Sequence, residues 1–533
     1  MDVVVPDTTT DAPRDRAGDV TDAPDSTEDA PSDATSPWRS ALYPEDWSPE
    51  ASTALHDFSY AGYRHGEQPP SGQDLMFDVS QYGASTDEEA DNTRAFQDAI
   101  DAAGQAEAAR SVVYVPPGEY RIGGRLEFGA SGVVLRGAGG QRTKLLFTAS
   151  LATGKAHIKF GAAPVVRAQQ EVVLAEDAPA RGHTVRVSDA SSLTVGQDVA
   201  LGWTISPAFV EAHGMTGTWK AFNGTWRPFF WRNITAIDTS TSPHTVTLDV
   251  PLRYDALTRD GASLRPVQPA IHECGIEAMS VTNAIDKDGA FASDRVHLVE
   301  FQGARDCWMR DVHSYASPLG EAPLIGEPRH VQSGGVLVLQ SARVSVLDSS
   351  MKYPQRQDEG GNGYLFEVSQ SSDVLMMGLD AVGGRHNFIQ NWGFGTSGCV
   401  WSDTRSLDGR ARNNGLWTLG YSEFHHSLAM ANLIERSVTT DGWSAIDRGS
   451  YSTGAGHTST QNVFWNIQGT GKLRSGQYGQ GYIVGTSEDI EIFVERFDQP
   501  NALPLDTVEG QGRASALEPQ SLYLDQRQRR LSR

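Results

Sequence analysis

The sequence predicts an all-β solenoid, a parallel β-helix, from its composition, the order of segments near its N-terminus and an approximate repeat in its second half. The 533 residues include 54 glycines and 26 prolines, which indicate many turns between short strands. A solenoid can take up this length as one body, whereas ordinary globular folds would divide it into domains. No apolar run approaches the roughly 18 residues of a membrane span.

The N-terminal segments follow a distinctive order. A short strand, FDVSQYGAS (77–85), comes first. The next segment places Phe96, Ile100 and Ala103 near helical spacing, with Asp91 or Asn92 as its N-cap. Three short segments rich in β-branched residues and separated by glycines then follow: VVYVPPGEYRI, LEFGASGVVLRGAG and KLLFT. This order predicts a strand, a helix and then successive strands.

These segments resemble the amino-terminal part of pectate-lyase-superfamily proteins. The match covers residues 77–140 and consists of D-V-x-x-Y-G-A, D-N-T-x-A-F-Q-x-A-I-D-A-A, V-Y-V-P-P-G-x-Y and V-x-L-R-G-A-G. In that superfamily the helix caps the first coil of a right-handed parallel β-helix. The resemblance therefore implies this fold, with an N-terminal cap helix, in an exported protein that acts on a carbohydrate polymer.

An approximate repeat supports the solenoid after residue 271. Similar segments are spaced 25 to 37 residues apart, which fits rungs of three short strands joined by loops of unequal length. They are CWMRDVHS at 307, VSVLDSSM at 344, VLMMGLDA at 374, CVWSDTRS at 399, NLIERSVT at 432 and NVFWNIQG at 462. Asn387, Asn432, Asn462 and Asn466 are expected to form buried asparagine ladders at rung turns.

Two segments stand apart from the rungs. Residues 1–40 are rich in Asp, Thr, Ala, Pro and Ser and are predicted to be a disordered acidic leader before the body at 41–533. Such tracts resemble the spacers of exported bacterial lipoproteins. We therefore expect a secreted or cell-surface protein whose signal segment is absent from this sequence. Residues 165–270 alternate apolar and polar residues around turn clusters and are predicted to be an inserted β subdomain.

Charge and cysteine content narrow the possible partners. The formal net charge of −23 argues against nucleic acid, which needs a basic face. It does not exclude an anionic polysaccharide, because a few arginines can reverse the local field. Cys274, Cys307 and Cys399 are too few for a disulfide framework, so three buried free thiols are expected. The sequence does not indicate an oligomeric state.

The candidate site is the polar stretch 352–457. Side chains from successive rungs stand side by side on a lateral face of a β-helix, so residues far apart in sequence can converge on one sugar. The catalytic candidates are Lys352, Arg356, Arg385, His386, His426, Asp441 and His457. The substrate-binding candidates are Trp226, Trp392, Tyr421, Glu423, Trp443 and Arg448.

The reaction predicted for these residues is β-elimination from a uronic-acid polymer. Arginine or a metal ion neutralises the carboxylate, a base removes the C5 proton, and an acid protonates O4. The Arg385–His386 pair with Arg356 or Lys352 suits this chemistry, and β-helix lyases of the alginate and chondroitin type resemble it in placing Lys and Arg on successive rungs. Ca²⁺ is the candidate cation, with Asp358, Glu359 and Glu367 as its loosely matching ligands.

Two alternatives remain open. A glycoside hydrolase would use paired carboxylates, either Asp441 with Asp447 or Asp403 with Glu423. The N-x-D…D-D…G-H-G pattern of polygalacturonases is absent, apart from GAGH at 454–457. A non-catalytic carbohydrate-binding or adhesion protein is the second alternative. His425 and His426 are adjacent, so only one is expected to point toward a ligand. The aromatic residues of the insertion, Trp226 among them, either form its small core or stack on sugar rings.

Overall fold

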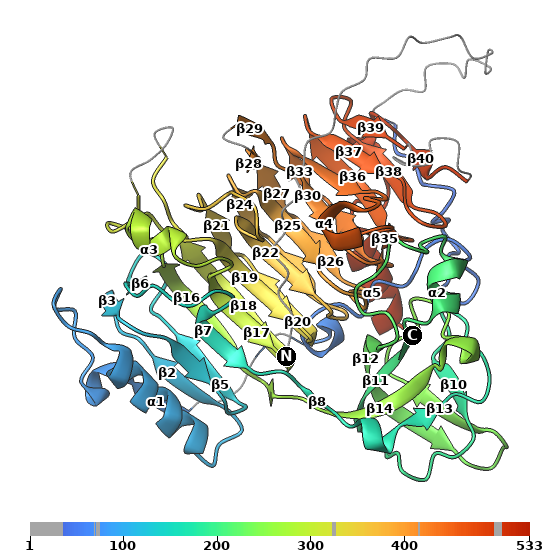
Figure 1. Ribbon diagram of the computed structural model, residues 1–533, viewed down its shortest axis with the longest axis horizontal. Helices are drawn as coiled ribbons and strands as arrows, with labels where there is room; N and C mark the ends of the chain where they lie inside the picture. Colours follow the sequence, from blue (N-terminus) through green and yellow to red (C-terminus); the bar gives the residue numbers. More distant parts are fainter. Residues whose placement is uncertain (1–35, 69, 71–74, 322–326, 414–415, 495–503) are drawn as a thin grey trace.

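The computed structural model describes residues 36–68, 70, 75–321, 327–413, 416–494 and 504–533. Each rung supplies three short parallel strands, as in β23 (Leu375–Met377), β24 (Asp380–Val382) and β25 (His386–Asn391). We call the three stacks of strands wall 1, wall 2 and wall 3, after the order of these strands. Walls 1 and 2 belong to a 19-stranded sheet, and wall 3 is a separate 10-stranded sheet. The rungs stack from the α1 end to the β39–β40 end (Figure 1). This is the right-handed parallel β-helix that the sequence predicts.

The repeat is confirmed in register on wall 1. Cys307 on β18 (Ala304–Ser314) pairs with Val344 on β20 (Ala342–Leu347), and Ser345 pairs with Leu375 on β23. The ladder continues from Leu375 to β26 (Val400–Ser402), β32 (Leu433–Glu435) and β36 (Val463–Gly469). The six repeat segments therefore lie one above another, and the unequal spacing reflects loops at the other corners of the rungs.

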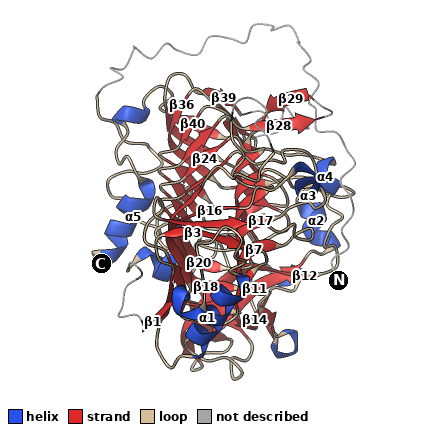
Figure 2. Ribbon diagram, turned by 90° about the vertical axis from the view of Figure 1, so that its left-hand side faces the viewer, coloured by secondary structure: helices blue, strands red, loops and turns tan. Residues whose placement is uncertain are grey.

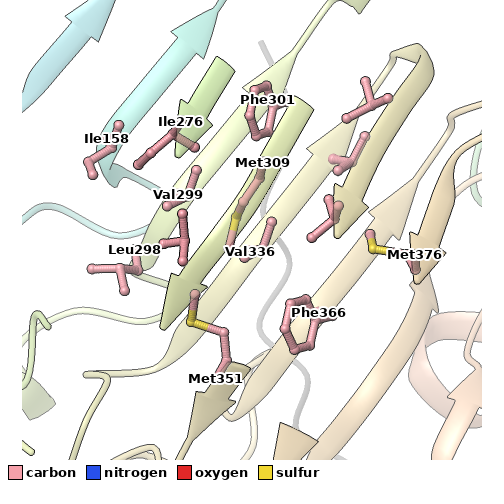
Figure 3. Close-up of a cluster of buried hydrophobic side chains, with 14 of the residues drawn as sticks. Ile158, Ile276, Leu298, Val299, Phe301, Met309, Val336, Met351, Phe366 and Met376 are labelled. Carbon is pink, nitrogen blue, oxygen red and sulfur yellow. The ribbon is translucent and has the colours of Figure 1, made fainter. Parts of the chain in front are cut away.

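The space enclosed by the three walls is filled with apolar side chains. Figure 3 shows side chains such as Val299, Met309, Val336 and Phe366, which come from β17 (His297–Gln302), β18, β19 (Gly334–Leu339) and β22 (Tyr364–Ser369) and meet between the walls. The three cysteines lie in this same core and are free and buried, as predicted.

One asparagine ladder runs through this interior. The Oδ1 of Asn432 accepts a hydrogen bond from the backbone N–H of Cys399, and the Oδ1 of Asn462 accepts one from that of Asn432, both at 2.9 Å. Asn387 and Asn466 lie elsewhere and bond Asp441 and Gln520. The predicted ladder therefore holds for two of its four members, because the other two stand at different positions along the rung.

Helix α1 (Thr93–Gln105) covers the first rungs and buries Phe96, Ile100 and Ala103 (Figure 2). The two candidate capping residues have different roles. The Oδ1 of Asp91 accepts a hydrogen bond from the N–H of Thr93 at 2.9 Å, whereas Asn92 occupies the N-cap position and bonds the neighbouring loop instead. The helix thus begins where the sequence indicates and closes the apolar end of the solenoid.

An antiparallel sheet is built from the segment where the sequence predicts an insertion. It runs from β8 (Val165–Val166) to β14 (Ser263–Gln268) and contains β11 (Asp198–Thr204) and β12 (Trp226–Asp238). Its aromatic residues pack together, with the rings of Trp203 and Phe229 stacked 3.6 Å apart. The subdomain lies beside the later rungs (Figure 1). Its Trp219 indole donates a hydrogen bond to the carbonyl of Ala455 at 2.9 Å.

The outer face of wall 1 is covered by both terminal segments. Tyr43 and Phe58 pack there with Leu522 and Tyr523 of α5 (Leu522–Leu531). Residues 36–40, which the sequence analysis assigns to the leader, already belong to this cover, because Trp38 forms a β-bridge with Leu517. The remainder of the predicted leader lies outside the described residues. Wall 1 is therefore closed to ligands along this cover.

Candidate functional site

Successive rungs of wall 3 carry a group of polar side chains on their outer face. Tyr364 of β22 and His386 of β25 are register partners, and Glu423 of β30 (Ser422–Phe424) pairs with Ile389 on the same wall. His425 directly follows β30. The loop after β34 (Gly442–Ala445) returns to the same place. We call this group the wall-3 cluster; its members are Tyr364, Arg385, His386, Glu423, His425 and Arg448.

The wall-3 cluster is almost closed to solvent. Tyr364 is 3% exposed, and the side chains of Arg448 and Glu423 are 9% and 10% exposed. In such surroundings charges interact more strongly than in water, and an unpaired charge is costly. The charge balance of the cluster therefore decides what it can bind.

His386 is held in one orientation by the backbone of the next rung. Its Nδ1 donates to the carbonyl oxygen of Tyr421 at 2.5 Å, which leaves Nε2 without a proton in the neutral ring. That Nε2 lies 3.4 Å from Oε1 of Glu423 and makes no hydrogen bond within the described part of the chain. Burial lowers the pKa of His386 below its ordinary value.

Glu423, His425 and Arg448 form a connected triad. The Nδ1 of His425 donates to Oε1 of Glu423, and Nη1 of Arg448 donates to the carbonyl of His425 at 2.9 Å. Burial raises the pKa of Glu423, but Arg448 and the two imidazoles outweigh burial and hold this pKa well below its usual range. Burial, followed by the Arg448 charge, lowers the pKa of His425 to about 3. At neutral pH the triad is thus a carboxylate, a neutral imidazole and a guanidinium.

Tyr364 completes the wall-3 cluster. Its ring centroid lies 5.1 Å from that of His386 and 6.1 Å from that of His425. Burial raises the pKa of the Tyr364 phenol above its ordinary value, so the hydroxyl keeps its proton. The cluster therefore offers a neutral imidazole, a protonated phenol and the cations of Arg385 and Arg448 within one small region, a set suited to proton transfer beside an anionic group.

Three of the predicted site residues meet in this cluster by direct contact: His386, Glu423 and Arg448. Arg385 lies near enough for its charge to act on Tyr364 and His386, and its guanidinium donates to the carbonyl of Asp358 at 3.2 Å. Tyr421 contributes through its backbone, because its carbonyl orients His386, while its ring lies under the guanidinium of Arg474 at 5.5 Å.

The two cations proposed to assist Arg385 are placed differently. Lys352 lies on β21 (Ser350–Lys352) of wall 2, not on wall 3. Arg356 is neutralised by Asp358 and Asp294, each with an oxygen 2.6 Å from its guanidinium. Lys352 therefore does not stand beside the wall-3 cluster, and the charge of Arg356 is already balanced by two carboxylates, so the catalytic role of both residues stays a prediction.

Asp441 and Trp443 point into the solenoid. Asp441 is fully buried and accepts hydrogen bonds from Ser406, Thr439 and Asn387 at 2.7 to 2.8 Å. Trp443 is fully buried and stacks parallel to Phe388 at 6.1 Å. The catalytic prediction for Asp441 and the sugar-binding prediction for Trp443 are therefore wrong, because both residues face the interior.

The hydrolase pairs do not come together. Asp441 faces the interior, whereas Asp447 lies 3.4 Å from His457 in the loop after β34. Asp403 binds Arg436 at 2.7 Å near wall 1, away from Glu423 on wall 3.

Two predicted histidines serve the packing of loops. His426 turns away from Glu423, contacts the ring of Trp392 at 4.3 Å and hydrogen-bonds the carbonyl of Ser452. Its neighbour His425 belongs to the wall-3 cluster, so only one of the two adjacent histidines lies at the candidate site. His457 lies between Trp219 of the insertion and Tyr478.

The two tryptophans proposed to bind sugar rings differ. Trp392 is 39% exposed beside Phe222 of the insertion and stays a candidate for stacking. Trp226 is occupied within the insertion, where Arg265 covers its ring at 4.0 Å and its indole donates to Ser263.

The residues proposed for calcium do not form a site. Both oxygens of Asp358 are hydrogen-bonded to Arg356, and Glu367 is held by His297 at 3.1 Å and Asn391 at 2.9 Å. Glu359 lies in the Asp358 loop, and its carbonyl accepts from Asn362. These carboxylates bind other side chains and do not converge as the six to eight oxygen ligands of Ca²⁺ require, so their geometry does not support the calcium prediction.

A family model described as "Rhamnogalacturonase A/epimerase, pectate lyase-like" matches residues 76–171. This segment contains the sequence motifs at 77–140, and the rungs that follow it continue the same solenoid. Residues 76–171 are thus pectate-lyase-like in sequence, and the fold of the described residues is a parallel β-helix. No protein of curated function matches its sequence.

Several solved structures resemble this β-helix protein weakly. ORF18 of Geobacillus virus E2 is 11% identical, with 79% of this chain and 58% of that chain covered and a TM-score of 0.40. Tailspike gp61 of Pseudomonas phage phi297 is 11% identical, with coverages of 79% and 75% and a TM-score of 0.40. The gp54 tailspike of Acinetobacter baumannii bacteriophage AP22, solved with a capsular saccharide, is 10% identical, with coverages of 82% and 69% and a TM-score of 0.38. Likeness at this level carries no information about activity.

Sequence reasoning missed two members of the wall-3 cluster in this β-helix protein. Tyr364 was not selected, although it follows the glycines at 360, 361 and 363 that end the Arg356 loop. The predicted catalytic histidine of the adjacent pair is His426, whereas His425 is the one in the cluster. The spacing Glu423-x-His425 was the available signal, because residues two apart on a strand face the same side.

Among the described residues no helix is long and apolar enough to cross a membrane.

Proposed function

We propose that this protein is an exported polysaccharide lyase that cleaves a uronic-acid-containing polymer by β-elimination. The observation that carries the proposal is the wall-3 cluster, which joins two arginines, an imidazole fixed by a carboxylate and a protonated phenol. The match to a pectate-lyase-like family model is compatible with this substrate class.

The roles follow from the geometry. Arg385 and Arg448 neutralise the uronate carboxylate, which acidifies the C5–H bond. The Nε2 of His425 takes the C5 proton while Glu423 holds Nδ1. The C5–H electrons form the C4=C5 double bond, the C4–O4 bond breaks, and the Tyr364 hydroxyl protonates O4. Because the side chains of Glu423 and Arg448 are only 10% and 9% exposed, a surrounding loop must shift to admit the sugar.

The first test is incubation of the full chain with a panel of uronic-acid polymers. We expect the ultraviolet absorbance of an unsaturated product, reduced about 10²- to 10⁴-fold in His425→Ala and Tyr364→Phe, the usual range for loss of an acid or base. His426→Gln and Tyr421→Phe serve as matched controls and should keep most of the activity. Full activity in folded His425→Ala would overturn the assignment.

Hydrolysis is the second candidate because Glu367 and Glu423 lie on one outward row of wall 3. Each pairs with Ile389 of the strand between them, so two strand spacings, about 9.5 Å, separate their backbones. That is near the upper limit for inverting glycosidases. Both carboxylates already bind histidines, which favours elimination. New reducing ends without ultraviolet absorbance would select hydrolysis, and polymer binding without either product would select an adhesion protein.

A further inference from the structure

Three side chains of the wall-3 cluster have the composition of a metal site. His386, Glu423 and His425 each offer one ligand atom, and these atoms lie within 4.8 Å of one another. Within the described ranges this is the only such group of three or more. All three residues are more than nine-tenths buried, so a bound ion would be largely shielded from water.

The strongest indication of a metal site is the Nε2 atom of His386, which has neither a proton nor a hydrogen-bond partner in the described part of the chain. Its Nδ1 donates to the carbonyl of Tyr421, which is how metal-binding histidines are commonly oriented from behind. Its Nε2 then presents a lone pair toward the Glu423 carboxylate 3.4 Å away, with no hydrogen bond. Two electron-rich atoms facing each other in a buried place repel unless a cation lies between them.

We infer that His386, Glu423 and His425 bind a divalent transition-metal ion of the Zn²⁺ class. Two imidazoles and one carboxylate suit Zn²⁺ and are poor ligands for Ca²⁺, which takes oxygen atoms. Three protein ligands leave a fourth position for water or another small ligand. The site differs from the carboxylates proposed for calcium, none of which belongs to it.

Arg448 is the resident cation that competes with the metal ion. Its Nη1 lies 2.9 Å from Nδ1 of His425 and 3.8 Å from Oε1 of Glu423. A divalent ion on these atoms would be repelled by the guanidinium, so Arg448 must swing aside when the ion binds. Removal of this charge should therefore strengthen metal binding, whereas removal of a ligand should weaken it.

Metal binding would also engage Glu423 and Nδ1 of His425, which the elimination needs as a proton-handling pair. We therefore expect the ion to inhibit the reaction. The expected inhibition rests on the proposed function, whereas the expected metal binding does not. A protein that binds Zn²⁺ but cleaves no uronic-acid polymer would therefore support the metal site and contradict the lyase proposal.

The test is calorimetric titration of the full chain with ZnCl₂, and Co²⁺ absorption supplies a second readout of the ligand geometry. We expect one site per chain, weakened at least tenfold by His386→Ala or Glu423→Gln and strengthened by Arg448→Met. His426→Gln, which changes a buried histidine outside the group, should bind as the unaltered protein does. Circular dichroism identifies variants that fail to fold. If the ligand variants do not fold, Arg448→Met decides the test, because an increase in Zn²⁺ affinity cannot result from misfolding.

Two outcomes would overturn the inference. The first is no Zn²⁺ binding by the full chain or by Arg448→Met. The second is binding that persists unchanged in folded His386→Ala, which would place the ion on other residues.

Discussion

His157 lies in the core of the solenoid, on β7 (Ala156–Gly161), with no exposed surface and its ring 4.8 Å from that of Phe147. Burial lowers its pKa from 6.5 to about 3. In the unfolded chain this histidine takes up a proton near pH 6.5, whereas the folded protein resists protonation until about pH 3. The unfolded state therefore binds more protons in this window, and stability falls as the pH decreases, by about 1.4 kcal/mol per unit.

We predict that His157→Leu makes the protein less sensitive to acid. Between pH 7.5 and pH 5 the unaltered protein should lose about 2 kcal/mol more of its free energy of unfolding than the variant does. Denaturant unfolding at the two pH values measures this difference. His272→Leu, at an exposed position, is the control. Equal losses in His157→Leu and the unaltered protein would show that His157 does not carry the effect.

At single residues, sequence reasoning was limited by irregular strands. Strict alternation would place Tyr364 and Glu367 on opposite faces, yet both lie outside because Leu365 and Phe366 both point into the core. Trp443 is a different case, because β34 alternates regularly and places Trp443 and Ala445 in the core. Arg385 and His386 could be predicted because a polar pair directly after two glycines is hard to bury without a purpose, whereas a tryptophan or aspartate fits either face.

Elements were more predictable than single side chains because rungs stack in register. The repeat at 307, 344 and 374 could be aligned from sequence, and the strands pair as this alignment requires. The docking of the insertion could not be predicted, because it depends on buried charges from two segments at least 120 residues apart. Arg232 and Arg253 of the inserted segment both bind Asp373 beside wall 1, at 2.9 and 3.2 Å.

This ion triad should hold the inserted subdomain against the solenoid. The three side chains are at most 1% exposed, so Asp373→Asn leaves buried arginines without a counter-charge, and we expect a loss of about 3–5 kcal/mol in the free energy of unfolding. Hydrogen exchange should rise first along β12. Asp408→Asn, at a side chain 67% exposed, is the control. The prediction fails if both variants unfold at the same denaturant concentration.

For the whole molecule, the motifs at 77–140 sufficed to predict the fold. They did not predict that the N-terminal segment and α5 pack together on wall 1. The N-terminal cover and α5 are more than 450 residues apart in sequence, yet the hydroxyl of Tyr523 donates to the carbonyl of Ala61 at 3.0 Å and Gln526 accepts from the N–H of Phe58. Such contacts form only after the rungs between them have stacked, and sequence patterns do not encode partners at this distance.

Deleting residues 521–533 should therefore release the N-terminal cover as well. Loss of buried Leu522 and Tyr523 removes about 1.5–3 kcal/mol for each side chain and exposes Tyr43 and Phe58 on wall 1. We expect a lower thermal midpoint and rapid protease cleavage within residues 41–66, while far-ultraviolet circular dichroism still reports the β-helix. Deleting only residues 532–533, beyond the end of α5, is the control. Protease resistance of residues 41–66 in the longer deletion would show that the N-terminal cover is held by wall 1 alone.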